Sequence, residues 1–138
     1  MDEIKAKEIF DKAQKKFEKN ENEAARDLWL QLLKFYPKKL SLLRNISLTY
    51  FKQNKLIETE NILKEILDIN LKETNALSML VLVLEEQDKI MEAKKFIQIG
   101  FDNNILSEHW KIKMNIMMPM IKMSTNIIEK FRSDIKKF

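Results

Sequence analysis

The sequence predicts an all-α protein whose helices stack in pairs as an α-solenoid. Three observations favour this fold class. The 138 residues include only one Gly and two Pro, which leaves little of the turn chemistry that β-hairpins and Gly-rich loops need. Apolar residues recur with helical spacing along much of the chain. A weak self-similarity with a period of 34 residues, which aligns Ala13 with Ser47 and Val81, indicates about three repeats of one helix pair.

The first repeat is expected at residues 6–39, and its pattern is the least regular of the three. Polar residues stand at three positions where apolar residues are expected, namely Lys12, Lys16 and Asn22. The apolar stripe is formed instead by Phe10, Ala13 and Phe17. A one-residue deletion in the turn between the two helices would restore the register, which predicts a shorter turn in this pair. Pro37 cannot continue the preceding helix and separates the first repeat from the second.

The second and third repeats are expected at residues 40–73 and 74–107, with helix-spaced apolar residues in both helices of each pair. In the first helices these residues are Leu43, Ile46 and Tyr50, then Leu77, Leu80 and Leu84. In the second helices they are Thr59, Ile62, Leu63 and Ile66, then Ala93, Phe96, Ile97 and Gly100. Because small residues let neighbouring backbones approach closely, we interpret Gly100 as a packing position.

The C-terminal part is expected to close the array. Residues 107–118 predict a capping helix with Ser107 as its N-cap, which would complete a repeat domain over residues 1–118. One face of this helix carries Trp110, Met114, Met117 and Met118. Pro119 ends it, and residues 119–138 predict an extended segment followed by a C-terminal helix.

The period and two turn segments, Tyr50–Leu56 and Leu84–Ile90, resemble the tetratricopeptide repeat (TPR) family. Where that family usually has Gly in the turn, this chain has Asn20, Asn54 and Asp88. Asn and Asp are the non-Gly residues that best tolerate a left-handed backbone, so we expect positive φ at these three positions. The resemblance implies a right-handed superhelix of about three helix pairs, with a concave groove that binds peptides of partner proteins.

The resemblance also implies which residues line the groove. Six of them are expected to contact a partner, namely Arg44, Asn45, Leu48, Phe51, Asn75 and Leu82. Their apolar members, with one charge from Arg44, would suit an apolar peptide or helix. The alternative is that Phe51 and Leu82 only pack the superhelix.

Chaperone-binding members of the family carry a two-carboxylate clamp of five residues, and this chain matches it only at Asn45. The other four positions hold Phe10, Gln14, Asn75 and Met79. An acidic chaperone tail is therefore not the expected ligand.

Composition argues against catalysis and bound cofactors. The chain has no Cys, and its single His, His109, has no spaced ligand partner for a metal. No Gly-rich loop or nucleophile elbow could place a cofactor. The longest apolar run, Leu80–Leu84, is too short to span a membrane, and the N-terminal residues lack the apolar run of a signal peptide, so we expect a cytoplasmic protein. The net charge of +4 is interspersed along the helices, which disfavours nucleic-acid binding.

Two alternatives to a peptide-binding adaptor remain open. Residues 110–121 and 127–132 are similar to the segment that joins repeats to the catalytic region in bacterial SPINDLY-type O-linked N-acetylglucosaminyltransferases. That resemblance implies the substrate-recognition or dimerisation region of a longer glycosyltransferase, with no catalytic residue in this chain. Three repeats in a short chain also suit a cytoplasmic secretion chaperone. A homo-oligomer is compatible with all three, because an incompletely capped array exposes an apolar end face.

Overall fold

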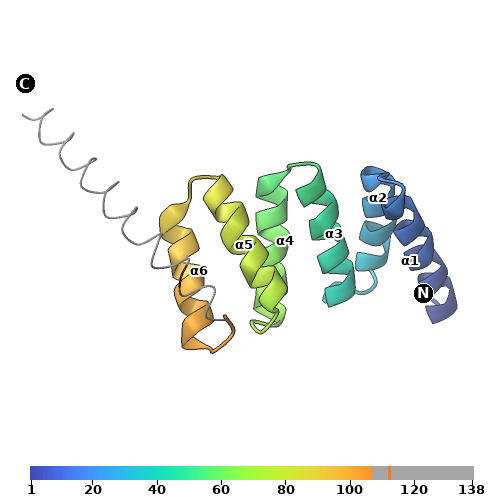
Figure 1. Ribbon diagram of the computed structural model, residues 1–138. Coiled ribbons are helices and arrows are strands. Elements are labelled where there is room, and N and C mark those ends of the chain that lie inside the picture. Colours follow the sequence, from blue (N-terminus) through green and yellow to red (C-terminus); the bar gives the residue numbers. More distant parts are fainter. Residues whose placement is uncertain (107–111, 113–138) are drawn as a thin grey trace, which may run out of the picture.

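The computed structural model describes residues 1–106 and 112, and within them the chain forms six helices and no strand. The helices are α1 (Glu3–Glu18), α2 (Asn22–Leu33), α3 (Leu40–Lys52), α4 (Leu56–Ile69), α5 (Thr74–Glu86) and α6 (Ile90–Asp102). Each helix packs against the next one along the chain, so that the array grows in one direction from α1 to α6 (Figure 1). The predicted all-α helical solenoid is confirmed. The predicted capping helix at 107–118 and the segment 119–138 lie outside the described residues, apart from Ile112.

The turn inside each pair has a left-handed residue, as the sequence predicts. Asn20, Asn54 and Asp88 have φ angles of 61°, 57° and 57°. In each turn the next residue donates its backbone N–H to a carbonyl five residues earlier, as when Lys55 N bonds Tyr50 O at 2.9 Å. These bonds satisfy carbonyls at the helix end that have no partner within the helix.

The expected deletion in the first turn is wrong. Asn20 lies 34 residues before Asn54, just as Asn54 lies 34 before Asp88, so all three turns have the same length. Lys16, which stands where Tyr50 stands in the second pair, is half-buried, and its Nζ lies 3.1 Å from Glu21 Oε2 across the turn. An ion pair replaces an apolar contact at this position, and the register is kept.

The core runs along the whole array in two clusters that share neighbours. The N-terminal cluster is centred on Trp29, which is 1% exposed and lies with its ring 6.1 Å from Phe10 and 5.7 Å from Phe17 between ring centroids. The C-terminal cluster is built from α3 to α6 and includes Leu77. Partly buried Leu33 and Ile62 pack against both clusters, which joins the repeats into one core.

Charged side chains link successive repeats at equivalent positions. Arg26 of α2 donates to Gln53 Oε1 at 2.7 Å and stacks 4.2 Å from the centroid of the Tyr50 ring. Glu60, which lies 34 residues after Arg26, accepts from Gln87 Nε2 at 2.8 Å. Gln53 and Gln87 are also 34 residues apart. The same pair of repeat positions is therefore hydrogen-bonded at both interfaces, with a cation at the first and an anion at the second.

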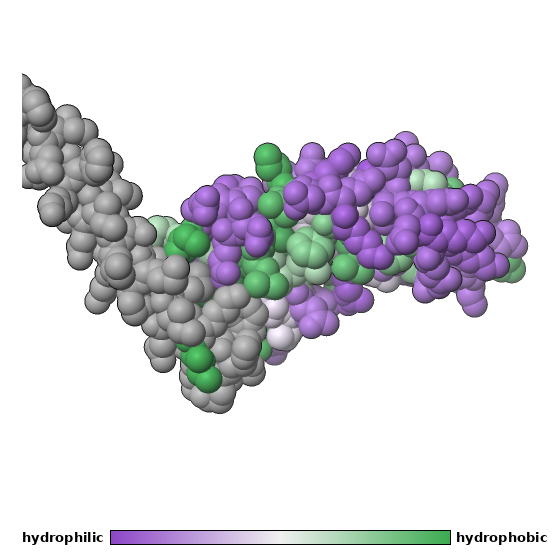
Figure 2. Space-filling model, turned by 45° about the horizontal axis from the view of Figure 1, so that its top comes forward, coloured by the Kyte–Doolittle hydropathy of each residue, from purple (hydrophilic) through white to green (hydrophobic). Residues whose placement is uncertain are grey.

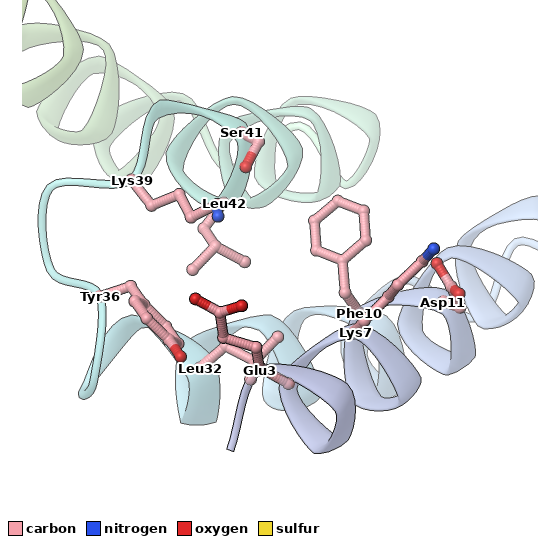
Figure 3. A pocket seen from close by; sticks show the side chains of 10 residues that line it. Glu3, Lys7, Phe10, Asp11, Leu32, Tyr36, Lys39, Ser41 and Leu42 are labelled. Carbon is pink, nitrogen blue, oxygen red and sulfur yellow. The ribbon is translucent and has the colours of Figure 1, made fainter. Parts of the chain in front are cut away.

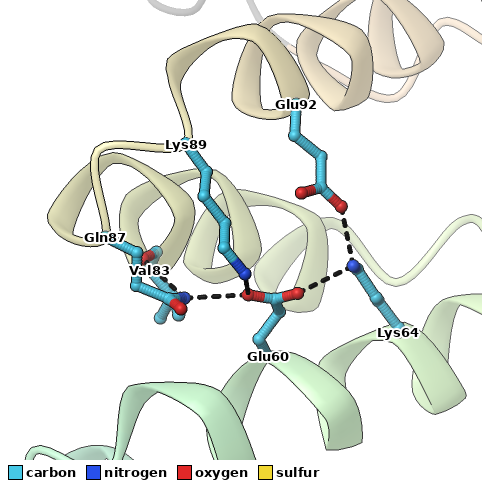
Figure 4. A network of polar contacts seen from close by, with 6 residues as sticks. All are labelled: Glu60, Lys64, Val83, Gln87, Lys89 and Glu92. Carbon is cyan, nitrogen blue, oxygen red and sulfur yellow. Dashed lines mark hydrogen bonds and ion pairs between the residues drawn. The ribbon is translucent and has the colours of Figure 1, made fainter.

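Glu60 is the centre of the larger of these two networks (Figure 4). Its side chain is 7% exposed and also accepts from Lys64 and Lys89, each at 2.8 Å, while Lys64 reaches Glu92 at 2.7 Å. Burial raises the pKa of Glu60, but the hydrogen bonds from Lys64, Lys89 and Gln87 outweigh burial and hold this pKa at about 2, below its usual value of 4.5.

Gly100 is a packing position, as predicted, but side chains and not a neighbouring helix backbone pack against it. It stands 34 residues after Ile66, but the side chain of Leu106 comes back from the following loop and occupies the space beside it. A Cβ on residue 100 would overlap with Leu106 and would lie 3.0 Å from Leu77 Cδ2. In the second repeat the side chain of Ile66 on α4 fills this part of the core. In the third repeat the side chain of Leu106 fills it in place of a side chain at residue 100.

We predict that Gly100→Ala destabilises the fold by about 1–2 kcal/mol, because the new methyl group displaces Leu106. Urea unfolding measures this change. Helix propensity alone would give the opposite result, a gain of about 0.5–1 kcal/mol. In a Leu106→Ala background the overlap is absent, so the same substitution should then be neutral or stabilising. Stabilisation in the wild-type background would show that Leu106 does not pack there.

We predict that Glu60→Gln costs about 1–3 kcal/mol at neutral pH, since it removes the carboxylate that two lysines share. Because the pKa of Glu60 is lowered on folding, its contribution is full above pH 4.5 and is lost as the pH falls towards 2. Wild type and Glu60→Gln should therefore converge in urea-unfolding stability across that range. Glu65→Gln, at an exposed position of the same helix, is the matched control and should run parallel to wild type.

Candidate functional site

The first helices of the three pairs, α1, α3 and α5, share one face of the array, which we call the groove face. Direct contacts join them. Lys52 of α3 places its Nζ 4.2 Å from the centroid of the Phe17 ring of α1. Arg44 of α3 reaches Glu73, the residue before α5. The groove face therefore crosses both boundaries between repeats.

The middle of the groove face carries exposed apolar side chains. Phe51 is 40% exposed and Leu82 is 44% exposed, and half-buried Leu48 and Met79 lie one turn before them on their helices. Figure 2 shows hydrophobic surface over the middle of the array, between α3 and α5, beside the hydrophilic surface of the N-terminal repeat. These side chains offer apolar area to a partner, and a large exposed apolar side chain is the kind of group that anchors one.

The polar residues predicted for the groove face have different surroundings. Arg44 holds Glu73 through two hydrogen bonds, Nε to Oε2 at 3.1 Å and Nη2 to Oε1 at 2.6 Å. The hydrogen bond from Arg44 lowers the pKa of Glu73, and the same bond raises the pKa of Arg44. Arg44 thus already has a carboxylate, and a partner's carboxylate would have to compete for it. Asn45 is half-buried and Asn75 is exposed at the start of α5.

A cavity of about 600 Å³ opens between the first two repeats, near the N-terminal ends of α1 and α3 (Figure 3). Its apolar part is formed by Ala6, Phe10, Leu32, Leu42 and the ring of Tyr36. Four charged side chains and a hydroxyl complete the lining, namely Glu3, Lys7, Asp11, Lys39 and Ser41. The volume falls in the range of about 300–1,000 Å³ that is typical of ligand pockets.

The six residues predicted to contact a partner do not line this cavity. Those six residues belong to the second and third repeats, whereas the cavity lies between the first and the second. The signal for it was present in the repeat alignment, because Phe10 aligns with Arg44 and Lys39 aligns with Glu73. An apolar residue and a cation thus stand where the next repeat has an ion pair.

The described residues contain no group of three or more His, Cys, Asp or Glu side chains that could hold a metal ion. His109 lies outside them. Among the same residues, none of the helices has the length and apolar content to cross a membrane.

Solved structures that resemble this chain are TPR domains. The first TPR domain of Spaghetti (RPAP3), bound to the HSP90 peptide SRMEEVD, superimposes with a TM-score of 0.70 at 20% identity over 88% of this chain and 97% of that one. The Sgt2 TPR domain from Aspergillus fumigatus gives 0.68 at 18% identity, over 88% and 82%. Yeast Tom70 gives 0.82 at 13% identity, over 93% of this chain and 26% of Tom70.

No protein-family model matches the sequence, and no curated protein matches it. The chain therefore has the fold of a TPR domain, established by three-dimensional similarity at low sequence identity.

Proposed function

We propose that this chain is a non-catalytic interaction module that binds a peptide or helix of a partner protein on the groove face. The observation that carries the proposal is the pair of large apolar side chains, Phe51 and Leu82, which stay 40% and 44% exposed on successive first helices. An amphipathic peptide bound on this face would remove their apolar area from water.

Neighbouring side chains on the same helices support this assignment. Leu48 and Met79 widen the apolar surface around the two anchors, and Asn45 and Asn75 offer side-chain amides that can bond a peptide backbone. The Arg44–Glu73 pair lies on the same face and adds a charged edge. This combination of a central apolar area with polar groups beside it is the usual anatomy of a protein interface.

The two alternatives have no comparable support. The segment that resembles a glycosyltransferase lies almost entirely outside the described residues, and the described helices carry nothing that favours a secretion chaperone. Both would still use the groove face to hold a protein, so a groove-face test applies to them as well.

We predict that Phe51→Ala and Leu82→Ala each weaken partner binding about tenfold or more without unfolding the chain, since each removes an anchor that is only partly buried in the free protein. A tagged pull-down from native lysate identifies the partner, and calorimetry with the purified partner measures the affinity. Ile57→Ala is the matched control, because Ile57 is 66% exposed but lies on α4, a second helix. Equal losses for all three variants, or none, would contradict the proposal.

A further inference from the structure

The cavity lies at the boundary between the first two repeats, and an ion pair bridges the boundary between the second and third. Arg44 and Glu73 bridge α3 and the start of α5, and both residues have counterparts 34 positions earlier, Phe10 and Lys39. Phe10 cannot form an ion pair, and Lys39 has the opposite charge to Glu73. At the first boundary the bridging pair is therefore missing, and the cavity stands in its place.

Lys39 is left without a carboxylate at this site. Among the described residues no Asp or Glu oxygen lies within 4.0 Å of its Nζ, which instead sits 5.6 Å from the centroid of the Tyr36 ring. In Figure 3 its side chain extends over the cavity beside Leu42, while the Phe10 ring forms the opposite wall. The site thus presents an unpaired cation next to an apolar surface.

Three other charges face the same cavity. In Figure 3 the Glu3 carboxylate points into the cavity, towards Leu42 and the end of the Lys39 side chain, and Lys7 lies close to Asp11. Lys7 and Asp11 are four residues apart on α1, so their charges offset each other along one helix face. Glu3 and Lys39 are the remaining opposed charges, and Glu3 is on the first turn of α1 with an exposed side chain that can turn into solvent.

We propose that this cavity binds a partner segment in which a bulky apolar side chain stands beside an Asp or Glu. The apolar side chain packs on the half-buried rings of Phe10 and Tyr36, over a floor formed by buried Leu32 and Leu42, and the carboxylate pairs with Lys39. The partner then restores, with reversed charge, the bridge that Arg44 and Glu73 form within the chain at the next boundary. This inference deepens the proposed function, because it assigns a second anchor point on the groove face and a partner chemistry.

The role of Glu3 follows from the same geometry. The Glu3 carboxylate repels the carboxylate of an incoming partner, and it also weakens the attraction that Lys39 exerts on that partner. A partner with a basic residue would instead use Glu3 and be repelled by Lys39. Removal of the Glu3 charge should therefore strengthen the binding of an acidic partner and weaken the binding of a basic one.

The test selects peptides from a random dodecapeptide library displayed on phage, with the 138-residue chain as bait. Selected peptides should share an apolar or aromatic residue next to Asp or Glu. A purified selected peptide should bind Lys39→Glu about tenfold or more weakly, because the mutation replaces an attraction by a repulsion. It should bind Glu3→Gln more tightly than wild type. No selection, basic–apolar sequences, or weaker binding to Glu3→Gln would overturn the proposal.

The closing variant Phe10→Arg with Lys39→Glu is the sharpest control, since it copies the Arg44–Glu73 pair into the first boundary. It should abolish peptide binding while circular dichroism and thermal unfolding show an intact array. If it fails to fold, the Lys39→Glu and Glu3→Gln responses still decide. Peptides that bind the folded closing variant as well as wild type would overturn the proposal. Ile57→Ala, at an exposed position of α4, is the neutral control and should leave peptide binding unchanged. If Phe51→Ala loses the cellular partner while Lys39→Glu binds the peptide like wild type, the groove proposal stands and this one falls.

Discussion

Packing of each helix against its sequence neighbour is the interaction on which the rest of this structure depends. No helix pair can bury its apolar stripe alone, so every repeat needs the next one, and the left-handed turns at Asn20, Asn54 and Asp88 return the chain at the same point each time. Because these turns are 34 residues apart, equivalent positions always face the same surroundings. A substitution at one of these positions therefore changes the chemistry of a boundary without a change in the period of the array.

The polar contacts show what this regularity allows. At the first boundary Arg26 donates a hydrogen bond to the side-chain oxygen of Gln53. At the equivalent positions of the second boundary, Glu60 accepts a hydrogen bond from the side-chain nitrogen of Gln87. The same two positions thus hold a cation with a Gln in one case and an anion with a Gln in the other. On the groove face the second boundary is bridged by an ion pair and the first is left open as a cavity. The scaffold thus keeps its shape while the chemistry of each boundary changes, and a cavity lies at the boundary that has no bridging ion pair.

Much of this fold could be predicted from the sequence because its signals are local. The apolar spacing, the scarcity of Gly and Pro, and the Asn and Asp residues at the turns each act within a few residues, and the single Gly100 implied close packing. The first turn was misjudged because the ion pair of Lys16 with Glu21 replaces apolar packing there. The cavity and the Glu60 network were missed because their members come from different repeats, and their contacts appear only once the repeats are stacked.

An amide NMR titration of the isotope-labelled chain with the purified partner segment shows directly whether the face made by α1, α3 and α5 binds the partner. We expect saturable shifts that cluster at Leu48, Phe51 and Leu82 and extend towards Phe10 and Lys39, while the exposed residues of α2, α4 and α6 stay unchanged. Shifts centred on the second helices, around Ile57 and Met91, would contradict this expectation.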